Sequence, residues 1–80
     1  MKTIVLNPAA ARQFDKLTGT FRDLLADALN AYAMGKPCDT KVMTGTPTVR
    51  MRVGDYRIIF DETSTTITVL ALGHRREIYR

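Results

Sequence analysis

The sequence contains little of what several large protein classes require. It has a single cysteine, Cys38, so it cannot form an internal disulfide or a metal site built from several cysteines. A lone thiol agrees with a reducing compartment. No apolar run approaches the length of a membrane span, and the N-terminal MKTIVLNPAAAR lacks the apolar segment and cleavage site of a signal peptide. We therefore expect a cytoplasmic protein that does not associate with membranes.

The charge of the chain is unevenly distributed. Eighty residues with 45% hydrophobic content suffice for one small domain, which we expect to span residues 1–80. The net charge is +4, and residues 41–80 carry seven basic and four acidic side chains, whereas residues 1–40 carry five and four. Six of those seven basic residues are arginine. Because arginine pairs bidentately with phosphate and stacks on bases, this bias favours a nucleic-acid partner.

The stretch from Thr48 to Asp61, TVRMRVGDYRIIFD, has the pattern of a tight hairpin. Gly54 and Asp55 separate two alternating runs, which predicts a two-residue turn of type I′ or II′. In the resulting register, one face of the hairpin is apolar and suited to a core. Its members are Val49, Met51, Val53, Tyr56, Ile58 and Phe60.

The opposite face of this hairpin carries Arg50, Arg52 and Arg57, with Arg52 directly across from Arg57. Like charges in opposite positions of an antiparallel pair are destabilising, by about 0.2–1 kcal/mol. Departures from a local rule are often found at functional sites. We therefore expect this face to bind an anion, with RNA as the first candidate.

The rest of the chain predicts a strand, two helices, a short extended piece and a final strand. The expected ranges are Lys2–Leu6, Pro8–Leu17, Thr20–Met34, Lys41–Met43 and Thr65–Leu72. Asn7 is expected to cap the first helix, Thr20 and Asp23 to form a capping box on the second, and Gly73 to end the last strand. The predicted class is α+β, with a small antiparallel sheet and an N-terminal helical hairpin packed on one face, in the order β-α-α-β-β-β. The last strand is expected to be central in the sheet.

The C-terminal GHRREIYR follows this final strand directly. Antiparallel topology would bring its His74, Arg75 and Tyr79 to the start of the hairpin, on the same side of the sheet as the three arginines. The structural alternative is that Arg75 and Arg76 are solvated and that Tyr79 packs the end of the chain. As a group with the hairpin arginines, the residue types favour a functional site.

Over its full length the chain resembles the RelE toxins of toxin–antitoxin modules, within the wider RelE/ParE superfamily. The most specific parts are RMRVGDYRIIFD and LGHRREIY. The resemblance implies cleavage of messenger RNA in the ribosomal A site, without a metal or other cofactor, by attack of the 2′-hydroxyl on the adjacent phosphate. It also implies a RelB-like cognate antitoxin, the ribosome and mRNA as partners, and contact with DNA only indirectly through the antitoxin.

The resemblance also implies roles for individual residues. Arg57 and Arg75 match phosphate-binding arginines, and Tyr79 matches a base-stacking tyrosine. Arg50 and Arg52 stand where the best-studied branch has lysines, and arginine cannot act as a general base. His74 is then a candidate proton-transfer group. Two further basic residues are assigned to RNA binding, Lys41 and Arg76.

Other functions agree less well with the residues of this chain. A metal nuclease would need converging carboxylates, but Asp55, Asp61 and Glu62 lie in or beside turns, and Asp23 and Asp27 lie on a polar helix face. Two alternatives stay open. One is a ParE-like toxin that inhibits DNA gyrase on the same fold, and the other is an RNA-binding module without catalytic activity.

Overall fold

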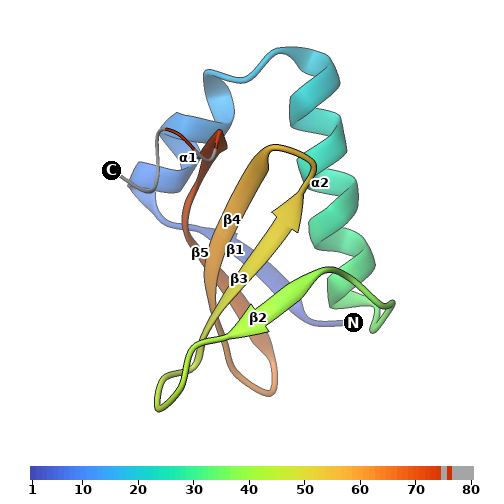
Figure 1. The fold of residues 1–80 in the computed structure, drawn as a ribbon, viewed down its shortest axis with the longest axis vertical. Coiled ribbons are helices and arrows are strands. Elements are labelled where there is room, and N and C mark those ends of the chain that lie inside the picture. The colour runs from blue at the N-terminus through green and yellow to red at the C-terminus, as the bar shows by residue number, and fades with distance from the viewer. Residues whose placement is uncertain (75, 77–80) are drawn as a thin grey trace.

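The structure, a computed structural model, describes residues 1–74 and 76 (Figure 1). Its elements follow the order β-α-α-β-β-β-β. They are β1 (Thr3–Leu6), α1 (Pro8–Asp15), α2 (Gly19–Ala33), β2 (Thr40–Val42), β3 (Thr48–Val53), β4 (Tyr56–Glu62) and β5 (Thr66–His74). The predicted α+β class is confirmed. Within the described residues, no helix is long and apolar enough to cross a membrane.

The five strands form one sheet in the order β1-β5-β4-β3-β2. Neighbours are antiparallel except for β1 and β5, which run parallel, so the sheet is mixed rather than wholly antiparallel as predicted. The extended piece expected at Lys41–Met43 is the edge strand β2, displaced by one residue. As predicted, β5 is central in the sheet, because it pairs with β1 on one side and β4 on the other.

The predicted register of the β3–β4 hairpin is confirmed. Val53 pairs with Tyr56 and Arg52 with Arg57, and the ladder continues in step to Thr48 and Asp61. Gly54 has a φ of 60°, a left-handed conformation that glycine adopts without a steric penalty. The turn therefore fixes which side chains of both strands face the core.

Strand β5 does not end at Gly73, contrary to the prediction. Gly73 pairs with Arg57, and His74 pairs with Tyr56. Glycine inside a strand costs roughly 0.5–1 kcal/mol, which pairing with β4 along the whole strand outweighs. This extension matters for the site, because the pleat of β5 then determines the direction of His74.

Helix α1 begins as predicted, with the Asn7 side chain accepting a hydrogen bond from the Ala10 N–H at 2.8 Å. Strand β1 pairs with β5 only as far as Val69, and α1 packs beside the remainder of β5. There the Gln13 Oε1 accepts a hydrogen bond from the Leu72 N–H at 2.9 Å. Helix α1 thereby occupies an otherwise open strand edge.

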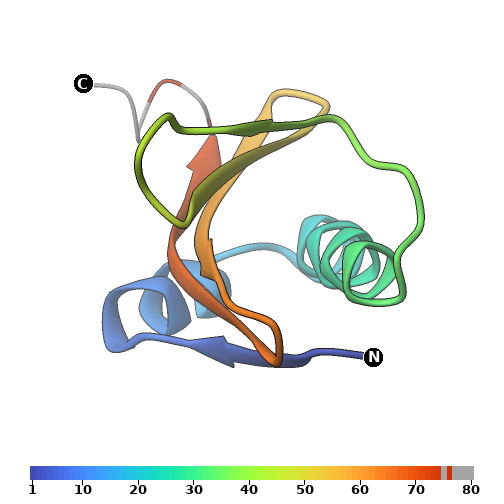
Figure 2. The ribbon, with the colours of Figure 1, turned by 90° about the horizontal axis from the view of Figure 1, so that it is seen from below.

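Helix α2 lies against the concave side of the curled sheet (Figure 2). Thr18 is at its N-cap without a side-chain capping bond, so the predicted capping box at Thr20 and Asp23 is wrong. Two large apolar side chains of α2, Phe21 and Leu24, are 40% and 45% exposed. The core is formed by the helices and the apolar face of the sheet, and its buried members are Ala10, Leu25, Leu29, Ala33, Val49, Met51, Ile58, Phe60, Ile67, Val69 and Leu72.

Candidate nucleic-acid interface

Four basic side chains lie on neighbouring strands, on the sheet face opposite the core. We call this surface the basic face, and its members are Lys41, Arg50, Arg52 and Arg57. Lys41 of β2 pairs with Arg50 of β3, and Arg52 of β3 pairs with Arg57 of β4. Directly opposite residues share a face, with their Cβ atoms about 4.5–5.5 Å apart. The arginine cluster predicted from the sequence is therefore assembled on the surface, and β2 adds Lys41 to it.

An acidic residue, Asp39, adjoins the basic face. The Arg52 N–H donates a hydrogen bond to the Asp39 carbonyl at 2.8 Å, which extends the β2–β3 register by one residue. Asp39 therefore stands opposite Arg52, and Asp39, Arg52 and Arg57 form a row across three strands. Asp39 was not predicted from the sequence, because its only signal is its two-residue spacing from Lys41, which has meaning only once β2 is known to be a paired strand.

The basic face surrounds a shallow hollow of about 310 Å³. Its lining consists of Asp39, Thr40, Lys41, Arg50, Arg52 and Arg57. Two guanidiniums are tied to their own hairpin: Arg52 Nε donates to the Gly54 carbonyl at 3.4 Å, and an Arg57 Nη donates to the Tyr56 carbonyl at 3.3 Å. Four cations around one carboxylate give the hollow a net positive charge, which suits an anionic ligand.

His74 lies on the other face of the sheet, so the prediction that it meets the arginines is wrong. It pairs with Tyr56, whose side chain faces the core, and the two rings are 5.7 Å apart in an edge-to-face arrangement. The cause is the pleat: Gly73 shares the face of Arg57, and the next residue points the opposite way. The His74 Nδ1 accepts a hydrogen bond from the Arg76 N–H at 3.2 Å.

His74 instead contributes to a second hollow, of about 430 Å³, between β5, the end of α1 and the start of α2. Its lining is Gln13, Lys16, Leu17, Thr18, Phe21, Tyr56, Leu72, Gly73 and His74. Of the other predicted site residues, Arg76 is exposed. Arg75 and Tyr79 lie outside the described residues. Among the described residues, no three His, Cys, Asp or Glu side chains are grouped to hold a metal ion.

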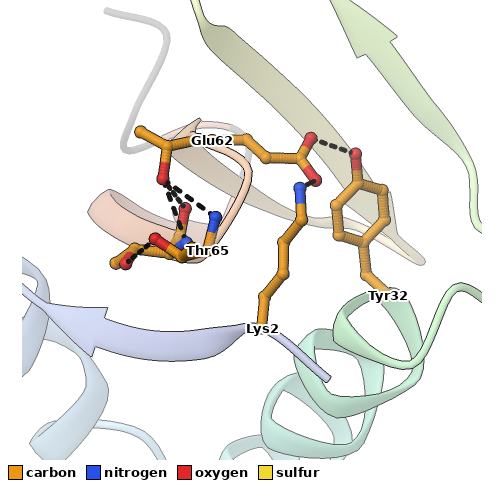
Figure 3. Close-up of polar contacts among 6 residues, drawn as sticks. Lys2, Tyr32, Glu62 and Thr65 are labelled. Carbon is orange, nitrogen blue, oxygen red and sulfur yellow. Dashed lines mark hydrogen bonds and ion pairs between the residues drawn. The ribbon is translucent and has the colours of Figure 1, made fainter.

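A separate polar cluster joins the N-terminus, α2 and the end of β4 (Figure 3). The Tyr32 hydroxyl donates to a Glu62 carboxylate oxygen at 2.7 Å, and the Lys2 ammonium pairs with the other oxygen. Burial, together with the hydrogen bond to Glu62, raises the pKa of Tyr32 to about 12. Burial alone would raise the pKa of Glu62, but hydrogen bonds from Lys2 and Tyr32 and the charge of Lys2 bring it below its usual value. No sequence motif predicts this cluster.

We expect Glu62→Gln to lower the free energy of unfolding by about 1–2 kcal/mol near neutral pH, because hydrogen bonds to a charged, half-buried carboxylate are lost. Because the pKa of Glu62 is lowered in the folded state, Glu62 contributes to the free energy of unfolding above its unfolded pKa, 4.5. That contribution is lost as the pH falls through the folded pKa. Because the pKa of Tyr32 is raised in the folded state, Tyr32 contributes to the free energy of unfolding below pH 10.0. That contribution is lost as the pH rises through about 12.

Urea unfolding as a function of pH measures this contribution. The difference between the wild type and Glu62→Gln should shrink on acidification, whereas Asp55→Asn, which alters an exposed carboxylate in the hairpin turn, should have little effect at any pH. A wild type and Glu62→Gln that unfold at the same urea concentration throughout would contradict a stabilising role for the cluster.

Several solved structures share this fold. A copper-bound mutant toxin from Helicobacter pylori superposes with a TM-score of 0.79 at 18% identity, over 99% of this chain and 100% of that chain. The RelBE toxin–antitoxin complex from E. coli superposes with a TM-score of 0.76 at 15% identity, over 92% of this chain and 96% of that chain. The RelB–RelE antitoxin–toxin complex from Methanococcus jannaschii superposes with a TM-score of 0.72 at 22% identity, over 94% of each chain. No curated protein sequence matches this chain.

These likenesses define the class of the protein, which has the fold of the toxins of the RelE/ParE superfamily. The sequence profile of one family within that class matches residues 2–79. The chain belongs to this family, the ParE toxins of type II toxin–antitoxin systems, parDE.

Proposed function

We propose that this type II toxin cleaves messenger RNA on the ribosome, with the basic face as its phosphate-binding site. The observation that carries the proposal is the pairing of like charges across strands, Arg52 with Arg57 and Lys41 with Arg50. Like charges directly opposite one another are ordinarily unfavourable by about 0.2–1 kcal/mol. A bound polyanion would offset that repulsion, because its phosphates attract all four cations.

The side-chain types support RNA as that polyanion. A guanidinium grips a phosphate through two parallel hydrogen bonds, so Arg52 and Arg57, side by side across the ladder, are suited to the scissile phosphate. Arg50 lies two residues from Arg52 along β3, on the same face and about 6–7 Å away, and suits the phosphate of an adjacent nucleotide. By resemblance, Arg75 would add a second phosphate contact and Tyr79 would stack on a base. The exposed Arg76 would also bind the RNA.

The proposed reaction needs stabilisation of negative charge more than covalent chemistry. The 2′-oxygen forms a bond to phosphorus, the bond to the 5′-oxygen breaks, and the products carry a 2′,3′-cyclic phosphate and a 5′-hydroxyl. Negative charge on the phosphoryl oxygens increases in the pentacovalent transition state. Arginines that are already in place stabilise it without reorganisation during the reaction.

We further propose a RelB-like antitoxin that covers the basic face with an acidic segment, and DNA contact only through that antitoxin. Two of the solved relatives are complexes of a RelE toxin with RelB, which supports the existence of such a partner. The net charge of +4 would speed the encounter with an acidic segment and help to select it.

Gyrase inhibition is the second candidate, and the description of the matching family as ParE toxins favours it. That function requires a binding surface for a protein and no group that transfers protons to or from RNA. It would leave the paired cations of the basic face without a phosphate ligand. We therefore rank it below RNA cleavage.

Two parallel assays of the purified protein distinguish the candidates. In a translation extract, primer extension should locate cuts within codons, and the 5′ fragments should end in a 2′,3′-cyclic phosphate. Supercoiling by purified gyrase should be unaffected at the same toxin concentration. Inhibition of gyrase without any cut in the message would assign the second function instead.

A further inference from the structure

We propose that Asp39 and Lys41 are the proton-transfer pair of the RNA cleavage, with Asp39 as the general base and Lys41 as the general acid. This inference rests on the proposed function and concerns the same hollow. The pair supplies the proton transfer that the arginines cannot, because a guanidinium stays protonated and can neither accept a proton nor readily give one up. It also replaces His74 in that role.

The composition of the hollow leads to these two residues. Of the described side chains that line it, three are arginines and one is the hydroxyl of Thr40, and the remaining two are Asp39 and Lys41. His74 is excluded from this hollow by the register of β5, which sends its ring to the core face beside Tyr56. Asp39 and Lys41 are both exposed, so an RNA strand on the basic face can reach them.

The register places both groups beside the proposed phosphate site. Asp39 stands opposite Arg52, which in turn stands opposite Arg57, so the carboxylate adjoins the two guanidiniums assigned to the scissile phosphate. Lys41 lies two residues along the strand, on the same face, about 6–7 Å from Asp39. In-line displacement puts the attacking and leaving oxygens on opposite sides of phosphorus, so two separated groups are needed.

The charges that face Asp39 come from all three strands, namely Lys41 of β2, Arg50 and Arg52 of β3, and Arg57 of β4. In the proposed step, the Asp39 carboxylate takes the proton of the 2′-hydroxyl as the 2′-oxygen bonds to phosphorus. The Lys41 ammonium gives a proton to the 5′-oxygen as its bond to phosphorus breaks. Water then returns both side chains to their starting forms, so protons and charge balance.

A substrate with sulfur in place of the 5′-bridging oxygen separates the two roles, because a thiolate leaves without being protonated. On programmed ribosomes with the ordinary message, Asp39→Asn and Lys41→Met should each lower the single-turnover rate at saturating toxin by about 10²–10⁴-fold. With the sulfur-substituted message, Lys41→Met should regain nearly the wild-type rate. Asp39→Asn should remain impaired, and Asp39→Glu should recover part of the activity.

Matched controls carry the same chemical changes elsewhere on the surface. Asp55→Asn in the hairpin turn and Lys36→Met in the loop before β2 are both exposed and should cleave both messages at the wild-type rate. Circular dichroism of each variant checks that it is folded. Binding of RNA by each variant is measured separately from the rate at saturation.

Three results would overturn the assignment. Asp39→Asn with the wild-type rate at saturation, whether or not it binds RNA more weakly, would show that Asp39 is not the base and at most positions Arg52. Lys41→Met that is equally slow on both messages would make Lys41 a phosphate ligand and not the acid. A wild type that cleaves neither message would reject the proposed function itself, which is a distinct outcome because no variant is needed to observe it.

Discussion

Arg52→Ala and Arg57→Ala are each expected to lower single-turnover cleavage of messenger RNA by about 10²–10³-fold, the usual effect of removing one preorganised donor from a developing oxyanion. The two residues pair directly across β3 and β4, and both line the hollow of the basic face. Primer extension on programmed ribosomes measures the rate. The two losses should not add fully in the double variant, because both guanidiniums contact the same phosphate in the proposal.

The controls for this prediction come from the same chain. Arg12→Ala removes the same charge from the exposed side of α1, far from the basic face, and should leave the rate unchanged. His74→Ala should also retain most of the activity, because its ring lies on the core face of the sheet. Urea unfolding should show that Arg52→Ala changes the stability by less than about 1 kcal/mol.

The result that would contradict the prediction is a loss of activity that follows net charge alone. If Arg12→Ala and Arg52→Ala were equally impaired, the basic face would not be the site of the chemistry. If His74→Ala lost activity while Arg52→Ala did not, the reaction would belong to the second hollow, on the opposite side of the sheet.

Phe60→Ala is expected to lower the free energy of unfolding by about 3–5 kcal/mol. The Phe60 side chain is 0% exposed, pairs with Val49 and Val69 in the sheet, and meets the Tyr32 ring edge to face at 5.1 Å. Its removal leaves a cavity and takes away this aromatic contact. Because small domains are stable by only about 5–15 kcal/mol, a large part of the stability would be lost.

Urea unfolding of three variants tests this expectation. Phe60→Leu keeps most of the side-chain volume and should lower the free energy of unfolding by less than Phe60→Ala. Phe21→Ala makes the same truncation at a side chain that is 40% exposed, and it should cost clearly less again. Equal losses at Phe21 and Phe60 would contradict the assignment of the core to the face that carries Phe60.

The hairpin shows how much a local pattern can determine. Gly54 and Asp55 provide the turn, and the alternation on both sides of it leaves one register in which every apolar side chain of the hairpin except Ile59, which pairs with Arg50, shares a face. Placement of Arg50, Arg52 and Arg57 together on the opposite face follows from the same alternation. The fold class and the capping of α1 by Asn7 were likewise predictable, because both depend on neighbouring residues or on the order of elements.

Pairing between distant strands decided the rest. The addition of β2 to the edge of β3 brings Asp39 and Lys41 to the basic face, although the loop sequence around them has no strand pattern of its own. The parallel pairing of β1 with β5 joins residues more than sixty positions apart, which no local rule specifies. Continued pairing with β4 carries β5 past Gly73 and turns His74 toward the helices. Sequence alone thus determined which charged side chains the hairpin presents. The tertiary structure decided which titratable groups lie beside them, because side-chain direction depends on a register set between segments far apart in the chain.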